Sequence, residues 1–330
     1  MLKALYLGVA LLGVLFFVPT AHAQYSTQDA PISFILTPSY PRPYQQVTVS
    51  PRSSLIDLSA SSVTISANGV VIQKGTGTQS ASVTVGGSGE VTKITVSVLG
   101  PDGKTYTTTS SVRPADVALV IEPDTTTHPL YKGLPLVASE GLVRLVAITD
   151  LRTTAKTLID PSTLVYQWKL GSQVLTSASG IGRSVLIATA PVRYRDAVIT
   201  LTVTSPDSSV VAEAKTTITP TDPIARIYSY DPLLGPDYDH ALTSVFSLSG
   251  TEASFRVVPY FFSAPPTIEW SVGGKAQGAQ QDITVRSTGS GAGSATLEAR
   301  AKNTENLQTA SSRTTLRFGE GNSPFSIFGF

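Results

Sequence analysis

Three short segments of this chain share one pattern, in which apolar and polar residues alternate and the run then stops at a pair of turn-forming residues. The segments are Val63–Gly69, Tyr166–Ser172 and Ile268–Gly274, which end in Asn-Gly, Gly-Ser and Gly-Gly. Alternation with period two places every second side chain on one face of a β-strand. The closing pairs supply the positive φ angles of a two-residue hairpin turn. Each segment therefore predicts a strand that leads into a hairpin, with Ile65, Trp168 and Trp270 directed to the core.

A second strand follows in each copy and ends at another turn signal. These strands are Ile94–Val98 before Pro101-Asp102-Gly103, Ile199–Val203 before Pro206-Asp207-Ser208, and Leu297–Ala301 before Asn303–Asn306. Proline and aspartate suit the first positions of a type I turn, so we expect a return strand after each of them. Such a repeat predicts one supersecondary unit that occurs three times.

Proline clusters open each copy and predict the domain boundaries. Proline cannot donate to a β-ladder, so clusters of it belong at edges and at domain entries. The resulting immunoglobulin-like domains cover 31–114, 115–222 and 223–318. Copies two and three have longer openings than copy one. The joins Arg113–Ala115 and Thr219–Pro223 are short and contain proline, which predicts semi-rigid spacers.

The composition agrees with strands and gives no sign of bulk-charge binding. Thr, Ser and Val dominate, and β-branched residues favour strands over helices. The chain contains no cysteine, so disulfides and thiolate metal sites are excluded and stability must come from hydrophobic cores. A net charge of +1 with 14% charged residues provides no basic stripe for nucleic acid. We therefore predict an all-β chain of tandem immunoglobulin-like β-sandwiches.

Several residues of copy one carry a family resemblance. The stretch Leu36–Pro43, the strand Val47–Ser50 and the Asn68-Gly69 hairpin resemble the immunoglobulin-like or PKD-like modules of bacterial surface proteins. The resemblance is in particular to hypothetical exported proteins of candidate-phylum bacteria. It implies surface display or adhesion, and it implies no chemistry.

The N-terminus has the layout of a secretory leader. Lys3 precedes an apolar run over 5–18, and Ala21-His22-Ala23 is a small-residue cleavage signature. At about 1.5 Å per residue, a helix over this run is shorter than the roughly 30 Å hydrocarbon core of a bilayer. We therefore expect a signal helix in a signal peptide over 1–23 and a linker over 24–30. Retention as a membrane anchor is the alternative.

No residue set in the sequence predicts catalysis, a cofactor or a metal. His128 and His240 fall in different predicted domains and cannot form a two-histidine site within one domain. Four carboxylates of copy three could offer oxygens to Ca²⁺, but they lack the spacing of a known calcium loop, which favours polar turns. They are Asp231, Asp237, Asp239 and Glu252. The run Gly289–Gly293 lacks the lysine and the following helix of a phosphate-binding loop, so it predicts a loop.

Two apolar features suggest binding instead. The aromatic residues of copy three could line a sugar-binding face or pack in the core. They are Tyr228, Tyr230, Tyr238, Tyr260, Phe261 and Phe262. The tail over 319–330 places Phe325, Ile327, Phe328 and Phe330 beyond a glycine-containing linker, which predicts either a docking peptide or a segment folded onto copy three.

The sequence thus predicts a non-catalytic structural or adhesive binding protein, exported to the cell surface or envelope. A carbohydrate-binding or enzyme-accessory module is the alternative. The expected partner is a protein or a component of the cell envelope, reached through the tail, or a glycan. Nucleic acid is not expected, and a membrane is expected only if the leader is retained. No cofactor and no metal are expected.

Overall fold

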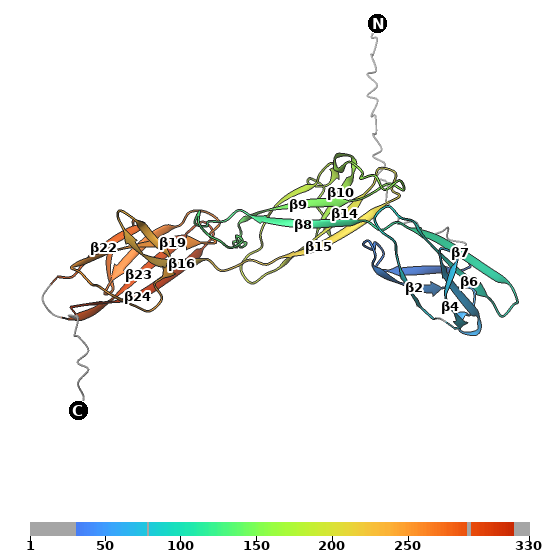
Figure 1. The fold of residues 1–330 in the computed structure, drawn as a ribbon, viewed down its shortest axis with the longest axis horizontal. Helices are drawn as coiled ribbons and strands as arrows, with labels where there is room; N and C mark the ends of the chain where they lie inside the picture. The colour runs from blue at the N-terminus through green and yellow to red at the C-terminus, as the bar shows by residue number, and fades with distance from the viewer. Residues whose placement is uncertain (1–30, 78, 289–291, 320–330) are drawn as a thin grey trace, which may run out of the picture. The chain divides into compact units, whose positions relative to one another are not determined.

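The computed structural model describes residues 31–77, 79–288 and 292–319, and Figure 1 traces its strands. These residues form β-strands and two 3-10 helices, η1 (Leu58–Ala60) and η2 (Pro161–Thr163), with no α-helix among them. The all-β fold of tandem immunoglobulin-like sandwiches that the sequence predicts is confirmed. The predicted signal helix lies outside the described residues. Nothing in the described part of the chain forms a helix with the length and apolarity needed to cross a bilayer.

The described residues belong to two compact units. The first contains the described residues up to Ser39, Val47–Val83 and Thr92–Val112; the second contains Tyr40–Gln46, Thr84–Val91 and the described residues from Arg113 onward. The predicted domain boundaries near 115 and 223 stay predictions, because the two compact units do not divide the chain into three consecutive domains.

The strands of the first copy form two antiparallel sheets. One has the order β1-β2-β5, with β1 at Ser33–Thr37, β2 at Gln46–Arg52 and β5 at Ala81–Thr84. The other has the order β4-β3-β6-β7, with β3 at Ser62–Ala67, β4 at Val70–Thr76, β6 at Thr92–Leu99 and β7 at Thr105–Val112. Asn68 and Gly69 have φ angles of 50° and 83°, the two positive values that a type I′ hairpin needs. Ile65 on β3 is fully buried.

The second copy repeats this arrangement. Its first sheet has the order β13-β9-β8, with β8 at Asp116–Pro123, β9 at Leu142–Asp150 and β13 at Val185–Thr189. Its second sheet has the order β11-β10-β14-β15, with β10 at Val165–Leu170, β11 at Gln173–Val174, β14 at Ala197–Thr204 and β15 at Val211–Ile218. The short β12 (Gly180–Ile181) also pairs with β10. Side chains of both sheets meet in one core, and Trp168 is fully buried there.

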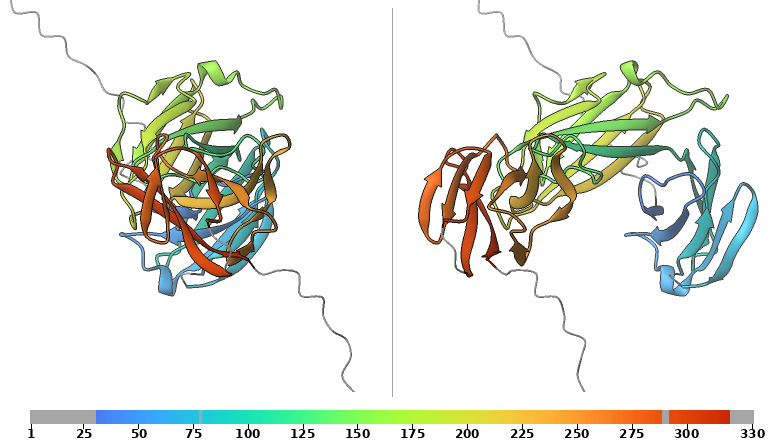
Figure 2. Two further views of the ribbon diagram at one scale, coloured as in Figure 1. Left: turned by 90° about the vertical axis from the view of Figure 1, so that its left-hand side faces the viewer. Right: turned by 60° about the vertical axis from the view of Figure 1, so that its left-hand side comes forward.

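The third copy keeps the same strands and adds two. Its first sheet has the order β17-β16-β19-β22, with β16 at Ile224–Asp231, β17 at Gly235–Ala241, β19 at Glu252–Tyr260 and β22 at Asp282–Arg286. Its second sheet has the order β18-β24-β23-β20-β21, with β18 at Val245–Ser247, β20 at Thr267–Val272, β21 at Lys275–Gly278, β23 at Gly293–Asn303 and β24 at Gln308–Phe318. Figure 2 shows these strands in orange to red. Trp270 lies in the core that the two sheets share.

One topological rule describes all three copies. The first strand of the repeat pairs with the second and the second pairs with the fifth, while the third strand pairs with the fourth and the sixth, and the sixth pairs with the seventh. Segments that are distant in sequence thus form two facing sheets, as in immunoglobulin-like sandwiches. The additions β17 and β18 both fall between the first two repeat strands of copy three.

Candidate ligand-binding site

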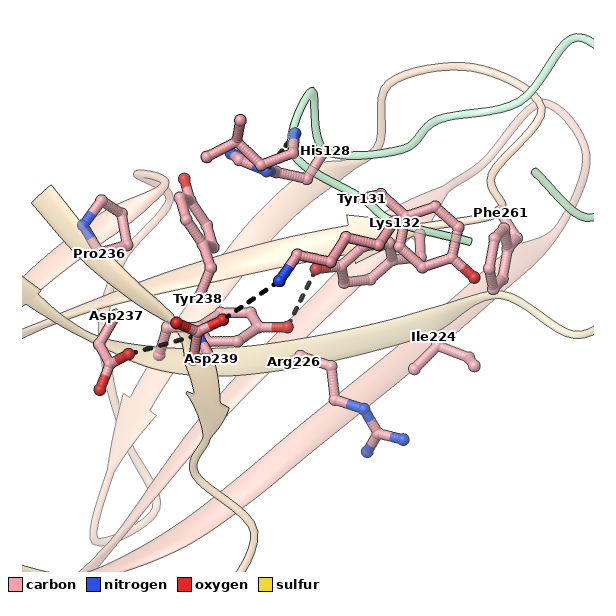
Figure 3. A pocket seen from close by; sticks show the side chains of 13 residues that line it. His128, Tyr131, Lys132, Ile224, Arg226, Pro236, Asp237, Tyr238, Asp239 and Phe261 are labelled. Atoms are coloured by element: carbon pink, nitrogen blue, oxygen red, sulfur yellow. Dashed lines mark hydrogen bonds and ion pairs between the residues drawn. The ribbon is translucent and has the colours of Figure 1, made fainter. Parts of the chain in front are cut away.

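The connection between the first two repeat strands differs most in length among the copies. It spans 38–45 in copy one, 124–141 in copy two and 232–251 in copy three, where it forms β17 and β18. Residues from the two longer connections line one cavity of about 830 Å³, together with residues of β16 and the end of β19. Figure 3 shows the side chains around it. Cavities of about 300 to 1,000 Å³ are typical of small-molecule sites, so this cavity has the size for a ligand.

The loop of copy two is fixed in place by Thr126. The backbone nitrogen of Thr126 donates to the carbonyl of Phe262 at 2.9 Å, and its carbonyl accepts from the nitrogen of Phe261 at 2.8 Å. Its hydroxyl accepts from the nitrogen of Phe262 at 3.0 Å. Phe261 has a φ of 62°, which is uncommon for an aromatic residue and turns the chain at the end of β19. These bonds hold the loop against the aromatic residues that follow β19.

Buried aromatic residues form one part of the cavity lining. Tyr228 and Phe261 are 6% and 4% exposed, and Tyr260 is 9% exposed. The hydroxyls of Tyr228 and Tyr260 share a hydrogen bond of 2.9 Å. Burial, followed by this hydrogen bond, raises the pKa of Tyr260, so its hydroxyl stays protonated. Tyr260 therefore adds an uncharged surface to the lining.

Two further aromatic contacts continue this lining. The ring of His128 lies 3.7 Å from that of Tyr238, measured between centroids, and Tyr238 meets Tyr228 edge-on at 5.5 Å. Burial, followed by the charge of Arg256, lowers the pKa of His128, so its imidazole is neutral near pH 7. Its Nδ1 accepts from the backbone nitrogen of Leu130 at 3.0 Å, which leaves the proton on Nε2.

Tyr131 adds a more accessible ring. It is 38% exposed and contacts Tyr260 and Phe261 at centroid distances of 5.6 and 5.9 Å. Its ring thus rests on the buried aromatic residues and still has surface open to solvent. An exposed aromatic surface supported by a rigid layer is suited to stacking against a flat ligand.

Charged side chains stand at the rim. Lys132 Nζ lies 3.9 Å from a carboxylate oxygen of Asp239, and the two side chains are 91% and 81% exposed. Figure 3 shows Lys132 extended toward Asp239, whereas Arg226 points away from this pair. Asp237 lies 3.0 Å from Nδ1 of His240. Lys132 and Arg226 balance Asp237 and Asp239, and His128 is neutral, so the lining has no net charge.

The carboxylates considered for calcium do not form a cluster. Among the residues that the structure describes, no group of three or more His, Asp or Glu side chains could hold a metal ion. Asp231 accepts from the backbone nitrogens of Leu233 and Leu234, which makes it a turn residue. Glu252 pairs with Arg286 at 2.6 Å.

The aromatic residues singled out in copy three separate into two groups. Tyr228, Tyr238, Tyr260 and Phe261 line the cavity, whereas Phe262 is fully buried and does not. Tyr230 lines a smaller cavity of about 370 Å³ and lies under the guanidinium of Arg256, 4.7 Å from its ring centroid. His128 was considered from the sequence only with His240, as a possible metal or catalytic residue, and no role was predicted for Tyr131 or Lys132. The one sequence feature that points to Tyr131 and Lys132 is the longer opening of copy two, in which both lie.

Two other predicted features involve residues that the structure does not describe. The tail residues Phe325, Ile327, Phe328 and Phe330 lie outside the described residues, as do 289–291 of the glycine-containing run. The docking role of the tail therefore stays a prediction.

Comparisons with known proteins give the following. No family model matches the chain. No curated protein matches its sequence. The three N-terminal domains of the Highly Immunogenic Outer Capsid protein of bacteriophage RB49 align at 14% identity over 87% of this chain and 97% of that one, with a TM-score of 0.27. The fibronectin(III)-like modules of Clostridium thermocellum CbhA align at 12% identity over 58% and 94%, with a TM-score of 0.28. The central fibronectin-III array of RIM-binding protein aligns at 10% identity over 89% and 98%, with a TM-score of 0.29.

Proposed function

We propose that this chain is a non-catalytic binding protein whose ligand site is the cavity between 128–132 and β16–β17. The observation that supports this is the lining, in which aromatic surface predominates and charged groups stand at the rim. Binding sites for small molecules combine an apolar lining with a few polar groups in this way. The immunoglobulin-like strands form the scaffold, and the two long connections supply the site.

The rim carboxylates argue for binding over catalysis. Asp237 and Asp239 lie two residues apart on β17, and a pair of carboxylates is the machinery of glycoside hydrolysis. A catalytic acid needs an apolar surrounding that keeps it protonated. Asp239 instead faces the ammonium of Lys132, and its side chain is 81% exposed. Asp237 is half exposed and accepts from the backbone nitrogen of Asp239 at 3.3 Å. Neither carboxylate has the surroundings of a general acid.

We further propose that the chain is exported and acts at the cell surface or envelope. The leader over 1–23 supports export, and the resemblance of copy one to surface modules supports display at the cell surface or envelope. N-terminal sequencing of the protein recovered from producing cells should find Gln24 first. Recovery of protein that still carries Leu5 to Val18 would instead make it membrane-anchored. A protein or envelope partner reached through the tail belongs to the same proposal.

A thermal-shift screen coupled to product analysis tests the binding role. The full mature chain is heated with neutral oligosaccharides, tetramethylammonium, aromatic acids and short peptides, and each mixture is then examined by mass spectrometry. A ligand that binds only the folded state raises the melting temperature, and the shift should be lost in Tyr131→Ala. Absence of a shift with every class of ligand, or conversion of the bound ligand, refutes the proposal.

A further inference from the structure

We propose that the cavity takes a neutral saccharide, bound by stacking on Tyr131 and by hydrogen bonds to Lys132 and Asp239. This inference rests on the proposed binding function and specifies its ligand class. It depends on three properties of the lining: an accessible aromatic surface, a charge-balanced rim, and donors and acceptors placed side by side.

The aromatic surface suits the apolar side of a sugar ring. A pyranose has a face of C–H groups that packs against a flat aromatic ring, while its hydroxyls point outward around the edge. Tyr131 has the accessible ring for this contact, and Tyr260 and Phe261 support it from behind. The support matters because a ring that is already held in place loses little conformational entropy on binding.

The charge balance selects against ionic ligands. A quaternary ammonium ion would use the tyrosine rings but would meet the ammonium of Lys132 and the guanidinium of Arg226 among the lining residues. An acidic ligand would meet Asp237 and Asp239 on the facing strand. A ligand without net charge avoids both repulsions.

The rim pair provides complementary hydrogen bonds. Lys132 Nζ and Asp239 lie 3.9 Å apart, too long for a direct hydrogen bond and close enough for neighbouring hydroxyls of one sugar to reach both. The lysine donates only and the carboxylate accepts only, whereas a hydroxyl does both. Hydrogen bonds to charged groups are stronger than those between neutral groups, so this pair would orient the sugar.

The test uses the full mature chain and soluble neutral polysaccharides: a β-glucan, a xylan, a galactomannan and an α-glucan. Affinity electrophoresis identifies a bound polymer, and titration calorimetry with its oligosaccharides measures the affinity. Alginate and tetramethylammonium are included as an acidic and a cationic probe. Released reducing ends are measured in parallel.

Three variants change the site and one serves as a control. Lys132→Ala and Asp239→Ala alter highly exposed side chains and should leave folding intact, while Tyr131→Ala removes the stacking ring. Each should weaken saccharide binding about tenfold or more, the fold-change that about 1.4 kcal/mol produces. Tyr194→Ala removes a tyrosine that is 84% exposed and does not line the cavity, so it should bind as the parent does.

The outcomes separate this inference from the proposed function. Saccharide binding that the three variants lose and Tyr194→Ala keeps supports it. If only tetramethylammonium or only the acidic polysaccharide alginate binds at the cavity, the inference of a neutral saccharide is wrong and the binding function stands. If a saccharide binds and reducing ends are released, the ligand class stands and the non-catalytic function is wrong. Equal saccharide binding by the parent and all variants overturns the site.

Discussion

Replacing Trp168 by alanine tests the core of the second copy. The Trp168 side chain is fully buried, and its Nε1 donates to the carbonyl of Arg183 at 2.9 Å. Truncating a buried Trp costs about 3 to 5 kcal/mol, and the unpaired carbonyl of Arg183 adds about 1 kcal/mol. Copy two, melting as the predicted domain 115–222, loses about 4 to 8 °C of melting temperature per kcal/mol, so the expected decrease is on the order of 12 °C or more.

Scanning calorimetry is the suitable assay, because a chain with several folding units does not unfold as one two-state transition. Trp270 lies in a different core and remains as a fluorescent reporter of copy three. The control is Leu170→Ala, which changes a residue on the same strand that is 42% exposed and should cost about 1 kcal/mol or less. If Trp168→Ala melts within a few degrees of this control, the register assigned to β10 is wrong.

Three further predictions address other parts of the chain. Gln308 is 2% exposed, donates to the carbonyl of Ser139 at 2.8 Å and accepts from the nitrogen of Ser263 at 3.0 Å. Because Gln308→Ala removes both hydrogen bonds, it should lower the free energy of unfolding by about 1 to 3 kcal/mol. Denaturant titration measures this change, and an unchanged midpoint would contradict the prediction. Hydrogen bonds from Ser205 and then Ser209 lower the pKa of Asp207 from 3.8 to about 2. Because the folded-state pKa is the lower one, the stabilisation is complete above about pH 4 and is lost as the pH falls toward 2. Asp207 is exposed, so the effect is about 1 kcal/mol or less, and melting curves of Asp207→Asn should depend less on pH in this window than those of the parent. Deleting 321–330 should leave the calorimetric transitions unchanged if the tail docks elsewhere, and a loss of several kcal/mol in copy three would assign Phe325 and its apolar neighbours to that core.

The fold could be predicted from the sequence because its signals are local. Alternation over six residues fixes which face of a strand is buried, and a pair such as Asn68-Gly69 fixes the hairpin that follows. Both signals survive the loss of sequence identity between the copies. The tryptophans at matching positions then place the centres of two cores.

The candidate site could be predicted only in part, because its residues come together through tertiary contacts. The aromatic residues of β16, β17 and β19 were visible as a group, yet nothing in their spacing separates Tyr260, which lines the cavity, from Phe262, which is fully buried. Tyr131 and Lys132 belong to a different copy of the repeat. These two residues lie beside the aromatic residues of copy three because the backbone of Thr126 is hydrogen-bonded to that of Phe262. No sequence pattern predicts that hydrogen bond.

The position of the two long connections explains how one sandwich repeat can acquire a binding site. Lengthening a surface loop costs little loop-closure entropy, so a connection can grow while the strands on either side keep their register. In copy one, where the connection spans only 38–45, the chain passes directly from β1 to β2. In copies two and three the added residues make their own hydrogen bonds, through Thr126 in one and through the pairing of β17 with β16 in the other. Neither connection encloses the cavity alone, since Tyr131 and Lys132 come from the first and Tyr238 and Asp239 from the second. A ligand that contacts both connections would therefore stabilise their association, and its binding should weaken when Thr126→Val removes the hydroxyl that accepts from Phe262.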